Sequence, residues 1–347
     1  MGNSLSGAPL SAAPISRFYA HSSWVDGSAE TQLTTLSRKG GILKIAAFPD
    51  LHPGKYGPVG VAILADRLFP QLIGNDIGCG MALFLLDIPA YKLKADKVAK
   101  RLRVLSAPQD GQLGTIGGGN HFCEVQTVGE VHQPVAGIGK NSTLLLVHSG
   151  SRALGQAVFA AHALGAVDGL LGPEAEAYFA AHNEAALWAA DNRRAIAERA
   201  AKALRCGARF ICDVPHNLVE ATPQGWLHRK GAAKADGPLV PLAGSRDAPS
   251  YLLCPNPPPE ALASLAHGAG RKFERASMRA RIGNPAGLTR TRFGGRVLCE
   301  DKQMLVEEAP KAYKNVRAVL ADIEAHGLAK RALTLHPFVT FKKAVQR

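Results

Sequence analysis

The chain has 347 residues, of which 46% are hydrophobic and 20% are charged, and this balance is typical of a globular protein with a sizeable core. It holds no run of about 18 apolar residues and no basic and then apolar secretory pattern at its N-terminus, so we expect a cytosolic protein with no membrane partner. The formal net charge of +13 favours a polyanionic partner such as RNA, but charge alone does not decide for nucleic acid.

The first 40 residues are rich in Ser, Ala and Gly, which predicts a loosely ordered arm or an edge element over residues 1–40, followed by a single domain over residues 41–347. From Gly40 onward, short apolar runs end in Gly- and Pro-rich turns that carry Asp and His. This pattern is typical of strands that present polar groups at their ends.

Two helices are predicted in the second half of the chain. One runs from near residue 173 to shortly before Gly207, and we interpret it as a packing element. The other spans residues 310–326, with an apolar face made of Val316, Val319, Leu320 and Ile323. Strands in runs, with the helices set apart, favour the α+β class over a doubly wound sheet.

The stretch from Ile73 to Asp87 reads IGNDIGCGMALFLLD and places Asp76 three residues before Cys79. Its glycines permit positive φ and close approach to the backbone. One interpretation is a tight turn around a buried, inert cysteine. The other is a site that presents a carboxylate and a thiol together. The six cysteines form no CxxC pair and are dispersed, so we expect reduced thiols that are free to ligate metal.

Four of the twelve histidines follow or interrupt short apolar runs and are flanked by Asn, Gly, Ser or Arg, which can orient an imidazole. These four are His121, His148, His216 and His267. With Asp76 and Cys79 they favour a site for a borderline divalent cation, and the residues alone leave zinc and manganese open. We assign no role to His21, His132, His162, His182 and His326.

Nine motifs, in order from near residue 47 to residue 343, resemble those of the RtcB-type RNA ligases. They are PDLHPG, NDIGCG, GGGNHFCEVQ, VHSGSR, PHN, HRKGAAKA, AGSRDAPSY, HGAGR and LHPFVTFKK. Several are long and unusual, unlike a lone GxGxxG. The resemblance implies an RtcB-like fold, with mixed sheets and helices around a central metal cleft. It also implies an enzyme that joins RNA ends with a 2′,3′-cyclic phosphate or 3′-phosphate to 5′-hydroxyl ends.

The same resemblance implies two manganese ions, GTP as cofactor and a histidine that becomes guanylylated. Carried over to this sequence, Cys79 would bridge both metals, with His148 and His216 completing one site and Asp76 and His121 the other. The catalytic, guanylylated position falls on His267. Guanylate contacts would come from Asn120, His121, Phe122, Cys123, Glu124, His216, Asn217, Ala243, Gly244, Ser245, Arg246, Ser250, His267, Gly268, Ala269, Gly270 and Lys342.

Further residues fit phosphate chemistry. Arg271, beside the glycines of HGAGR, is predicted as a bidentate phosphate contact. The cations of HRKGAAKA are predicted to contact the phosphates of RNA, and they are Arg229, Lys230 and Lys234. The alternative is a solvated surface without a ligand, which is the usual role of such basic clusters. We interpret Asp50 and His52 as groups that orient the metal ligands.

The chain departs from the family pattern where the usual PGSM reads AGSR, which changes Ala243 and Arg246 near the expected nucleotide. It is also shorter than the long archaeal members and resembles the branch often encoded with a release-factor homologue. That branch implies repair of damaged RNA more than routine tRNA splicing. Two alternatives stay open: a metal-dependent phosphodiesterase that processes RNA ends, which would not need His267, and a non-catalytic RNA-binding relative.

Overall fold

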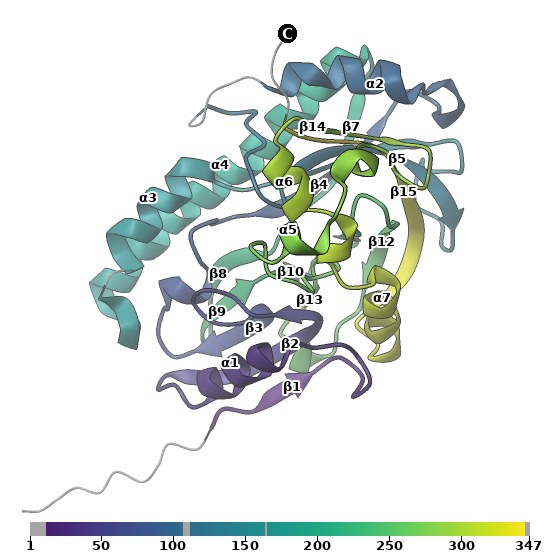
Figure 1. Ribbon diagram of the computed structural model, residues 1–347. Coiled ribbons are helices and arrows are strands. Elements are labelled where there is room, and N and C mark those ends of the chain that lie inside the picture. The colour runs from purple at the N-terminus through teal and green to yellow at the C-terminus, as the bar shows by residue number, and fades with distance from the viewer. Residues whose placement is uncertain (1–11, 107–111, 164, 344–347) are drawn as a thin grey trace, which may run out of the picture.

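A computed structural model describes residues 12–106, 112–163 and 165–343. Two sheets, a two-stranded ribbon and helices packed outside them make up the fold, which confirms the expected α+β class (Figure 1). Residues 1–11, which belong to the predicted N-terminal arm, lie outside the described residues.

The first sheet has five strands in the order β1-β2-β3-β9-β8. They are β1 (Ile15–Arg17), β2 (Ile42–His52), β3 (Val59–Ala65), β9 (Gly225–Lys230) and β8 (Asn217–Thr222). The edge strand β1 pairs in parallel with β2, and α1 (Gly27–Ser37) contacts β2. Residues 12–40 therefore contain an edge strand and a helix, whereas a boundary at residue 40 between two parts of the chain stays a prediction.

The second sheet runs β11-β12-β15-β5-β6-β4-β7, and β14 pairs with β15 beside this path. Its strands are β11 (Val240–Leu242), β12 (Ser250–Pro255), β15 (Ala329–Lys343), β5 (Phe122–Val131), β6 (Thr143–Ser149), β4 (Gly80–Leu86), β7 (Ala208–Pro215) and β14 (Arg296–Cys299). The ribbon consists of β10 (Ala232–Lys234) and β13 (Ser264–Ala266). Because β10 contacts β3 of the first sheet and β7 of the second, the ribbon connects the two sheets.

Helices cover one face of the second sheet, where the long α4 (Gly172–Leu204) crosses β4 and β6 beside α2 (Ala95–Leu102) (Figure 1). The remaining helices are α3 (Arg152–Ala163), α5 (Met278–Arg281), α6 (Lys302–Glu307) and α7 (Val316–Ala325). Short 3₁₀ turns span Pro70–Leu72, Ala90–Lys92, Arg103–Ser106, Ala166–Asp168, Pro259–Ala261, Pro285–Thr289 and Pro310–Ala312.

Both predicted helices are present, but the start of the last one is corrected. Residues 310–312 form a 3₁₀ turn, and α7 begins only after Asn315. The Asn315 side chain accepts a hydrogen bond from the backbone N–H of Arg317 at 3.0 Å, and this N-cap separates the helix from the turn. The predicted apolar face of α7 is confirmed, since Val316, Val319, Leu320 and Ile323 are buried.

All six cysteines are free, as expected. Among the described residues, no helix combines the length and the apolar character that crossing a bilayer requires.

The turn between Ile73 and β4 packs directly on α4. Gly78 in this turn has φ +68°, and a Cβ built there would lie 2.7 Å from the Cα of Ala186 in α4. The turn reaches the helix only because position 78 has no side chain. Gly74, at the other end of the turn, has φ +88° but nothing within 4 Å of such a Cβ.

Gly78→Ala and Gly74→Ala therefore form a matched pair of variants. Both place alanine at positive φ, which costs about 1–2 kcal/mol, but only Gly78→Ala also forces the turn off α4, which adds about 1–3 kcal/mol. We expect denaturant unfolding to show the larger loss of stability for Gly78→Ala. Equal losses in the two variants would contradict the close packing of turn and helix.

Candidate active site

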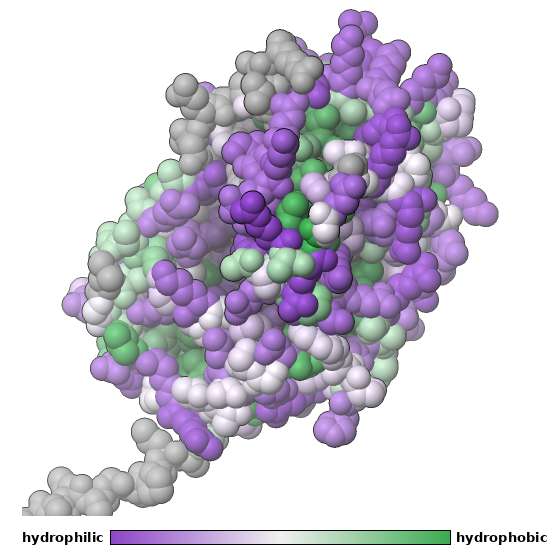
Figure 2. Space-filling model, viewed as in Figure 1, coloured by the Kyte–Doolittle hydropathy of each residue, from purple (hydrophilic) through white to green (hydrophobic). Residues whose placement is uncertain are grey.

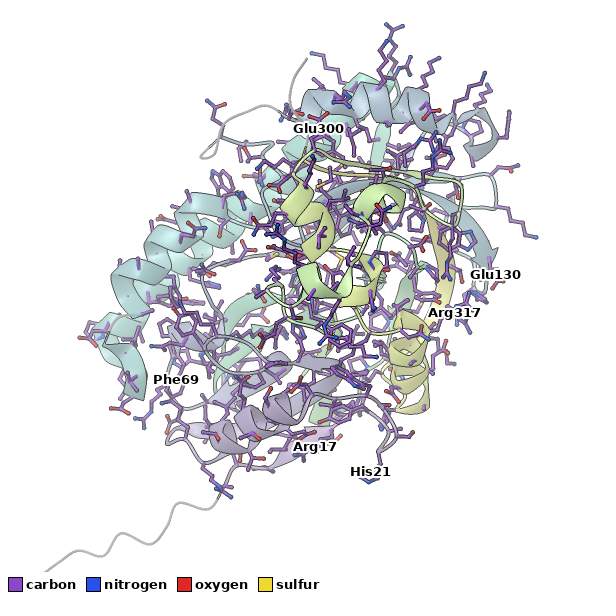
Figure 3. The ribbon with its side chains drawn as sticks, viewed as in Figure 1. Arg17, His21, Phe69, Glu130, Glu300 and Arg317 are labelled. Carbon is purple, nitrogen blue, oxygen red and sulfur yellow. The ribbon has the colours of Figure 1, made fainter. Side chains whose placement is uncertain are left out.

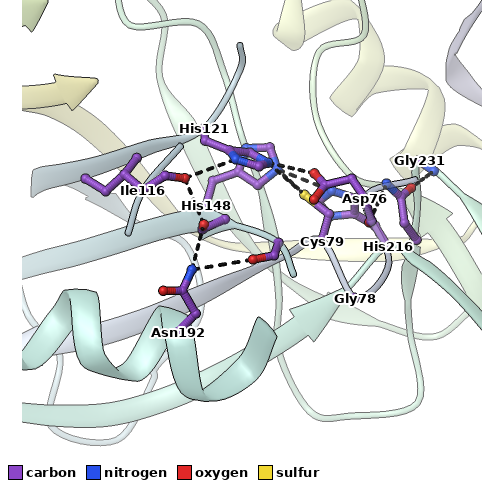
Figure 4. Close-up of polar contacts among 12 residues, drawn as sticks. Asp76, Gly78, Cys79, Ile116, His121, His148, Asn192, His216 and Gly231 are labelled. Carbon is purple, nitrogen blue, oxygen red and sulfur yellow. Dashed lines mark hydrogen bonds and ion pairs between the residues drawn. The ribbon is translucent and has the colours of Figure 1, made fainter. Parts of the chain in front are cut away.

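The five side chains predicted as metal ligands converge in one cluster, in which the thiol and the three imidazoles are buried and Asp76 is partly exposed (Figure 4). Asp76 Oδ2 lies 2.8 Å from His121 Nε2, and His148 Nε2 lies 3.3 Å from His216 Nε2. Cys79 Sγ lies between these two pairs, 3.3 Å from His121 Nε2 and 3.2 Å from His148 Nε2. A thiol, a carboxylate and three imidazoles thus share one small volume, which we call the donor cluster.

Strand register explains why these distant positions meet. Gly80, the first residue of β4, pairs with Ser149 of β6 on one side and with Pro215 of β7 on the other. The neighbouring residues Cys79, His148 and His216 therefore lie at the same end of three adjacent strands. His148 also pairs with Phe122 of β5, which brings the preceding His121 to the same point.

Burial sets the protonation states in the donor cluster. It lowers the pKa of both His148 and His216, so these imidazoles are neutral and each keeps a lone pair. Burial raises the pKa of the Cys79 thiol, and the Asp76 carboxylate raises it further. Among the described residues, the buried Nδ1 of His216 has no hydrogen-bond partner. A divalent cation would favour the thiolate and accept the lone pairs, so this donor set fits a metal.

Two buried polar residues of α4 hold the segments that carry the donor cluster, and Figure 4 draws the first of them, Asn192. Asn192 accepts hydrogen bonds from the backbone N–H groups of Gly114 and Thr115 and donates to Ser149 Oγ at 3.1 Å. Arg193 donates to the carbonyl oxygens of Gly78 at 2.7 Å and Ser149 at 2.9 Å. The helix interpreted from sequence as a packing element is therefore also the support of the site.

His267, just after β13, lies beside the donor cluster, with its ring centroid 4.5 Å from that of His216. Its Nδ1 lies 2.6 Å from Asp50 Oδ2 and 2.7 Å from the carbonyl oxygen of Gly231. Both partners are acceptors, so Nδ1 carries a proton, and in the neutral ring Nε2 carries the lone pair.

The expected role of Asp50 and His52 needs correction. Asp50 orients His267 and contacts no residue of the donor cluster in any described hydrogen bond, and His52 binds the backbone oxygen of Asp50 at 2.7 Å. The two residues therefore support the predicted nucleophile and not the predicted metal ligands.

A pocket opens beside His267 and contains most of the predicted nucleotide contacts. Those that line it are Asn120, Phe122, Glu124, Ala243, Gly244, Ser245, Arg246, His267, Gly268, Ala269, Gly270 and Lys342. Side chains alternate along β5, so Phe122 and Glu124 face the pocket while Cys123 points into the core under α2 and α4. The Cys123 thiol therefore does not face the pocket, and the predicted nucleotide contact at this position stays a prediction that only its backbone could fulfil.

Four other predicted contacts lie behind the pocket wall. His121 and His216 belong to the donor cluster. Asn217 Oδ1 accepts the backbone N–H of Gly231 at 2.8 Å, and Ser250 Oγ accepts that of Gly244 at 3.1 Å. Asn217 thus fixes the residue whose carbonyl contacts His267, and Ser250 fixes the AGSR loop.

The predicted RNA track on HRKGAAKA is wrong. Arg229 is 1% exposed and forms an ion pair with Glu220, which also binds Lys234 Nζ at 2.6 Å. Lys230 is buried and donates to the carbonyl oxygen of Gln71 at 3.2 Å. These cations neutralise or bind groups of the protein itself, so they form no surface for phosphates.

The predicted bidentate contact by Arg271 is corrected as well. Its guanidinium donates to Glu308 Oε1 at 3.1 Å and to the backbone oxygens of Glu307 and Phe273. Glu308 also accepts hydrogen bonds from Arg275 Nε and Tyr313 Oη. Arg271 therefore belongs to a network that shapes the pocket wall.

The sequence matches the family described as tRNA-splicing ligase RtcB over residues 32–110 and 103–343. It is 38% identical to RNA-splicing ligase RtcB2 of Escherichia coli, in an alignment that covers 92% of this chain and 93% of that protein. The chain belongs to the RtcB family. RNA-splicing ligase RtcB of Mycobacterium tuberculosis is 31% identical, in an alignment that covers 65% of this chain and 64% of that protein. tRNA-splicing ligase RtcB of Pyrococcus abyssi is 29% identical, in an alignment that covers 70% of this chain and 32% of that protein.

The whole donor cluster, His267 and the pocket fall inside the part of the chain that matches RtcB. In the AGSR loop, where the chain departs from the RtcB pattern, Arg246 is buried in the pocket wall and donates to the carbonyl oxygen of Leu305 at 2.8 Å. Its guanidinium is thus partly engaged within the protein, although it still lines the pocket.

Sequence reasoning missed several residues of the site. Asn192 and Arg193 had a visible signal, since they follow the helical spacing of the buried Ala185, Ala189 and Ile196 and are polar. Other missed residues, for which no sequence signal stands out, line the pocket: Met81, Arg275, Glu308, Tyr313 and Thr340.

Cys79→Ala should weaken metal binding by at least about 100-fold, because removing a ligand costs more than removing a group that merely orients one. Cys123→Ala is the matched control, since Cys123 is equally buried but points into the core. Elemental analysis of the purified variants checks this. Full metal content in Cys79→Ala, or equal loss in both variants, would rule out the thiol as a ligand.

Proposed function

We propose that this chain is a GTP- and manganese-dependent RNA ligase that joins 2′,3′-cyclic phosphate or 3′-phosphate RNA ends to 5′-hydroxyl ends. Membership in the RtcB family supports the RNA ligase class. The observation that carries the mechanism is the pairing of His267 Nδ1 with Asp50, which leaves Nε2 as a lone-pair donor beside the donor cluster.

In this proposal the donor cluster would hold two manganese ions, and the ligand common to both would be Cys79. The central position of its sulfur between the Asp76–His121 pair and the His148–His216 pair supports that division of ligands. When bound, the ions would offset the negative charge that gathers on phosphoryl oxygens. Neutral imidazoles and a buried thiol are the forms such ions bind once the thiol loses its proton.

His267 acts as the nucleophile. Its Nε2 lone pair forms a bond to the α-phosphorus of GTP while the bond to pyrophosphate breaks. The ring then carries a positive charge, which the fixed carboxylate of Asp50 stabilises through Nδ1. An oxygen of the RNA 3′-phosphate next takes the guanylate from His267, and attack by the 5′-hydroxyl oxygen on that RNA phosphate releases GMP.

The pocket beside His267 would hold the nucleotide. Lys342 lines it and donates to the carbonyl oxygen of His121 at 3.0 Å, and burial lowers the pKa of Lys342 to about 8. Below that pH the ammonium is charged and suits a phosphate. Glu124 is fixed by Gln126 and Thr340, and we assign it to hydrogen bonds with the guanine edge or the ribose.

The two alternatives differ from the ligase in what they require. A metal-dependent phosphodiesterase would open a cyclic phosphate with metal and water alone, and it has no use for a histidine held by a buried carboxylate. A non-catalytic RNA-binding relative needs neither His267 nor the donor cluster. For the cellular role we propose RNA repair in the cytoplasm, with a release-factor homologue as a functional partner.

Wild-type protein incubated with labelled GTP and Mn²⁺ should acquire an acid-labile guanylate, and His267→Ala should acquire none while it still binds metal. The loss is expected because alanine has no nitrogen lone pair that could attack the α-phosphorus. His132→Ala, an exposed histidine to which we assign no role, is the control and should label normally. Mass mapping of the adduct to another residue would overturn the assignment.

Asp50→Asn should slow guanylylation by about 10²–10⁴-fold at unchanged metal content, because the amide no longer fixes the tautomer or stabilises the charged ring. Asp322→Asn removes another buried carboxylate, which accepts hydrogen bonds from Ser23 Oγ and the backbone N–H of Ala20 and makes no described hydrogen bond to His267, and it controls for general destabilisation. The labelling rate and the bound metal are measured on the same samples. Similar labelling rates in the two variants would refute the role of Asp50.

A further inference from the structure

The surface around α2 carries positive charge that the ligase mechanism does not use. Residues 88–106 hold six cations and one carboxylate, and residues 289–300 hold three cations and one carboxylate. The two segments lie together, since α2 contacts β14 and Arg296 Nε pairs with Asp96 at 2.6 Å. Their net charge of +7 is more than half of the +13 of the whole chain. We call these two segments the α2 basic surface.

A groove of about 370 Å³ runs through the α2 basic surface between helix and strand. Lys100 and Arg103 line it on the α2 side, together with the carboxylate of Asp96, and Arg290 and Arg296 line it on the other side, so the groove has four cations and one carboxylate. The groove floor is apolar, with Ala99, Val297 and Leu298. Cations on both walls of an open groove match the way in which proteins follow a phosphate backbone.

The exposed lysines of α2 are close to one another. Lys97 and Lys100 are one helical turn apart, and like charges at this spacing weaken a helix by about 0.2–0.5 kcal/mol. Arg103 forms an ion pair with Glu300, the residue labelled near the top of Figure 3. A polyanion bound along the groove would relieve the repulsion on α2.

The α2 basic surface suits a nucleic acid better than a lipid bilayer. The apolar residues of α2 are buried against the sheet, namely Val98, Ala99 and Leu102, so the helix has no apolar face to insert. In Figure 2 the side chains over α2, at the upper right, are mainly hydrophilic. Phosphate groups are therefore the ligand chemistry that this surface recognises.

The groove and the pocket lie on opposite faces of the second sheet, around the β14 edge. Along β15, Val339 and Phe341 face the core under α2, whereas Thr340 and Lys342 line the pocket. β14 joins the two regions, because Arg296 pairs with Val339 and Leu298 with Phe341. An RNA strand that reaches His267 would have to bend round this edge before it met α2, so the groove would contact phosphates some nucleotides away from the reacting end.

We infer that the α2 basic surface binds the phosphate backbone of RNA at a distance from the ends being joined, and so favours long RNA over short fragments. The inference rests on the proposed function in one respect, since it takes RNA as the polyanion. It adds a second contact region that chemistry at His267 does not require.

The test compares two double variants that remove equal charge. Lys97→Gln/Lys100→Gln removes two exposed cations of the surface, and Arg38→Gln/Lys330→Gln removes two exposed cations from elsewhere. For a tRNA-length RNA, the first variant should bind about tenfold more weakly at physiological salt, with a log–log salt slope shallower by about 1.4. A 3′-phosphorylated hexanucleotide should bind to it as tightly as to wild type, and the control should match wild type for both RNAs.

Equal weakening for long and short RNA, or no difference from the control, would overturn the inference. GTP labelling of His267 is measured in the same variants and should be unchanged, because labelling needs no RNA. If wild type forms no adduct, the proposed ligase mechanism fails, while the comparison of RNA lengths still decides whether the surface binds RNA. Polyglutamate, an acidic polypeptide, serves as a competing polyanion. If wild type binds polyglutamate and shows no preference for long RNA, the surface takes another polyanion and the inference fails.

Discussion

The buried guanidinium of Arg193 joins the three segments on which the site depends. It donates to the carbonyl oxygen of Gly78 in the turn, to that of Ser149 at the end of β6, and to both carboxylate oxygens of Asp213 in β7. Removing a buried charge of this kind leaves its partner uncompensated and typically costs about 3–5 kcal/mol. The same contacts fix the ends of the strands that carry Cys79, His148 and His216, so the stability of this region and the geometry of the donor cluster have one origin.

The contacts of Arg193 explain how the side chains of the donor cluster can be held together although their mutual contacts add little to the stability of the fold. The imidazoles of His148 and His216 are neutral and face each other through nitrogen atoms, and the thiol of Cys79 has a raised pKa beside a carboxylate. Their mutual contacts contribute little to folding, so packing and hydrogen bonds from α4 must supply the rigidity. A site preorganised in this way loses little conformational entropy when it binds a metal.

The sequence predicted the site residues well where a short motif contains the reactive groups. It predicted them poorly where a residue's role depends on a partner that is distant in the sequence. Glycine-supported motifs predicted the residues of the donor cluster, and the resemblance to the RtcB-type ligases implied most of the residues that line the pocket. The role of Asp50 was assigned wrongly, because its partner His267 lies 217 positions away and only the connection between the first sheet and the β10–β13 ribbon brings the two together. The basic segment HRKGAAKA was misread for a related reason. Its charges suggest a solvated surface that could bind RNA, yet the last four residues of β9 are all buried. The burial of Arg229 can be recognised only once its ion-pair partner Glu220 is known.

The register of β15 separates the two surfaces that the chain presents. Thr340 and Lys342 face the pocket, while Val339 and Phe341 support α2, so a slip of one residue would exchange a lysine of the pocket for a core phenylalanine. β15 shifts register against β5 between Pro337 and Val339, and a proline cannot donate to the ladder at that point. Beyond this irregularity the strand pairs with both β5 and β14. A strand held on two sides cannot slip without breaking both ladders, and this restraint keeps the pocket beside His267 on one face and the charge of α2 on the other.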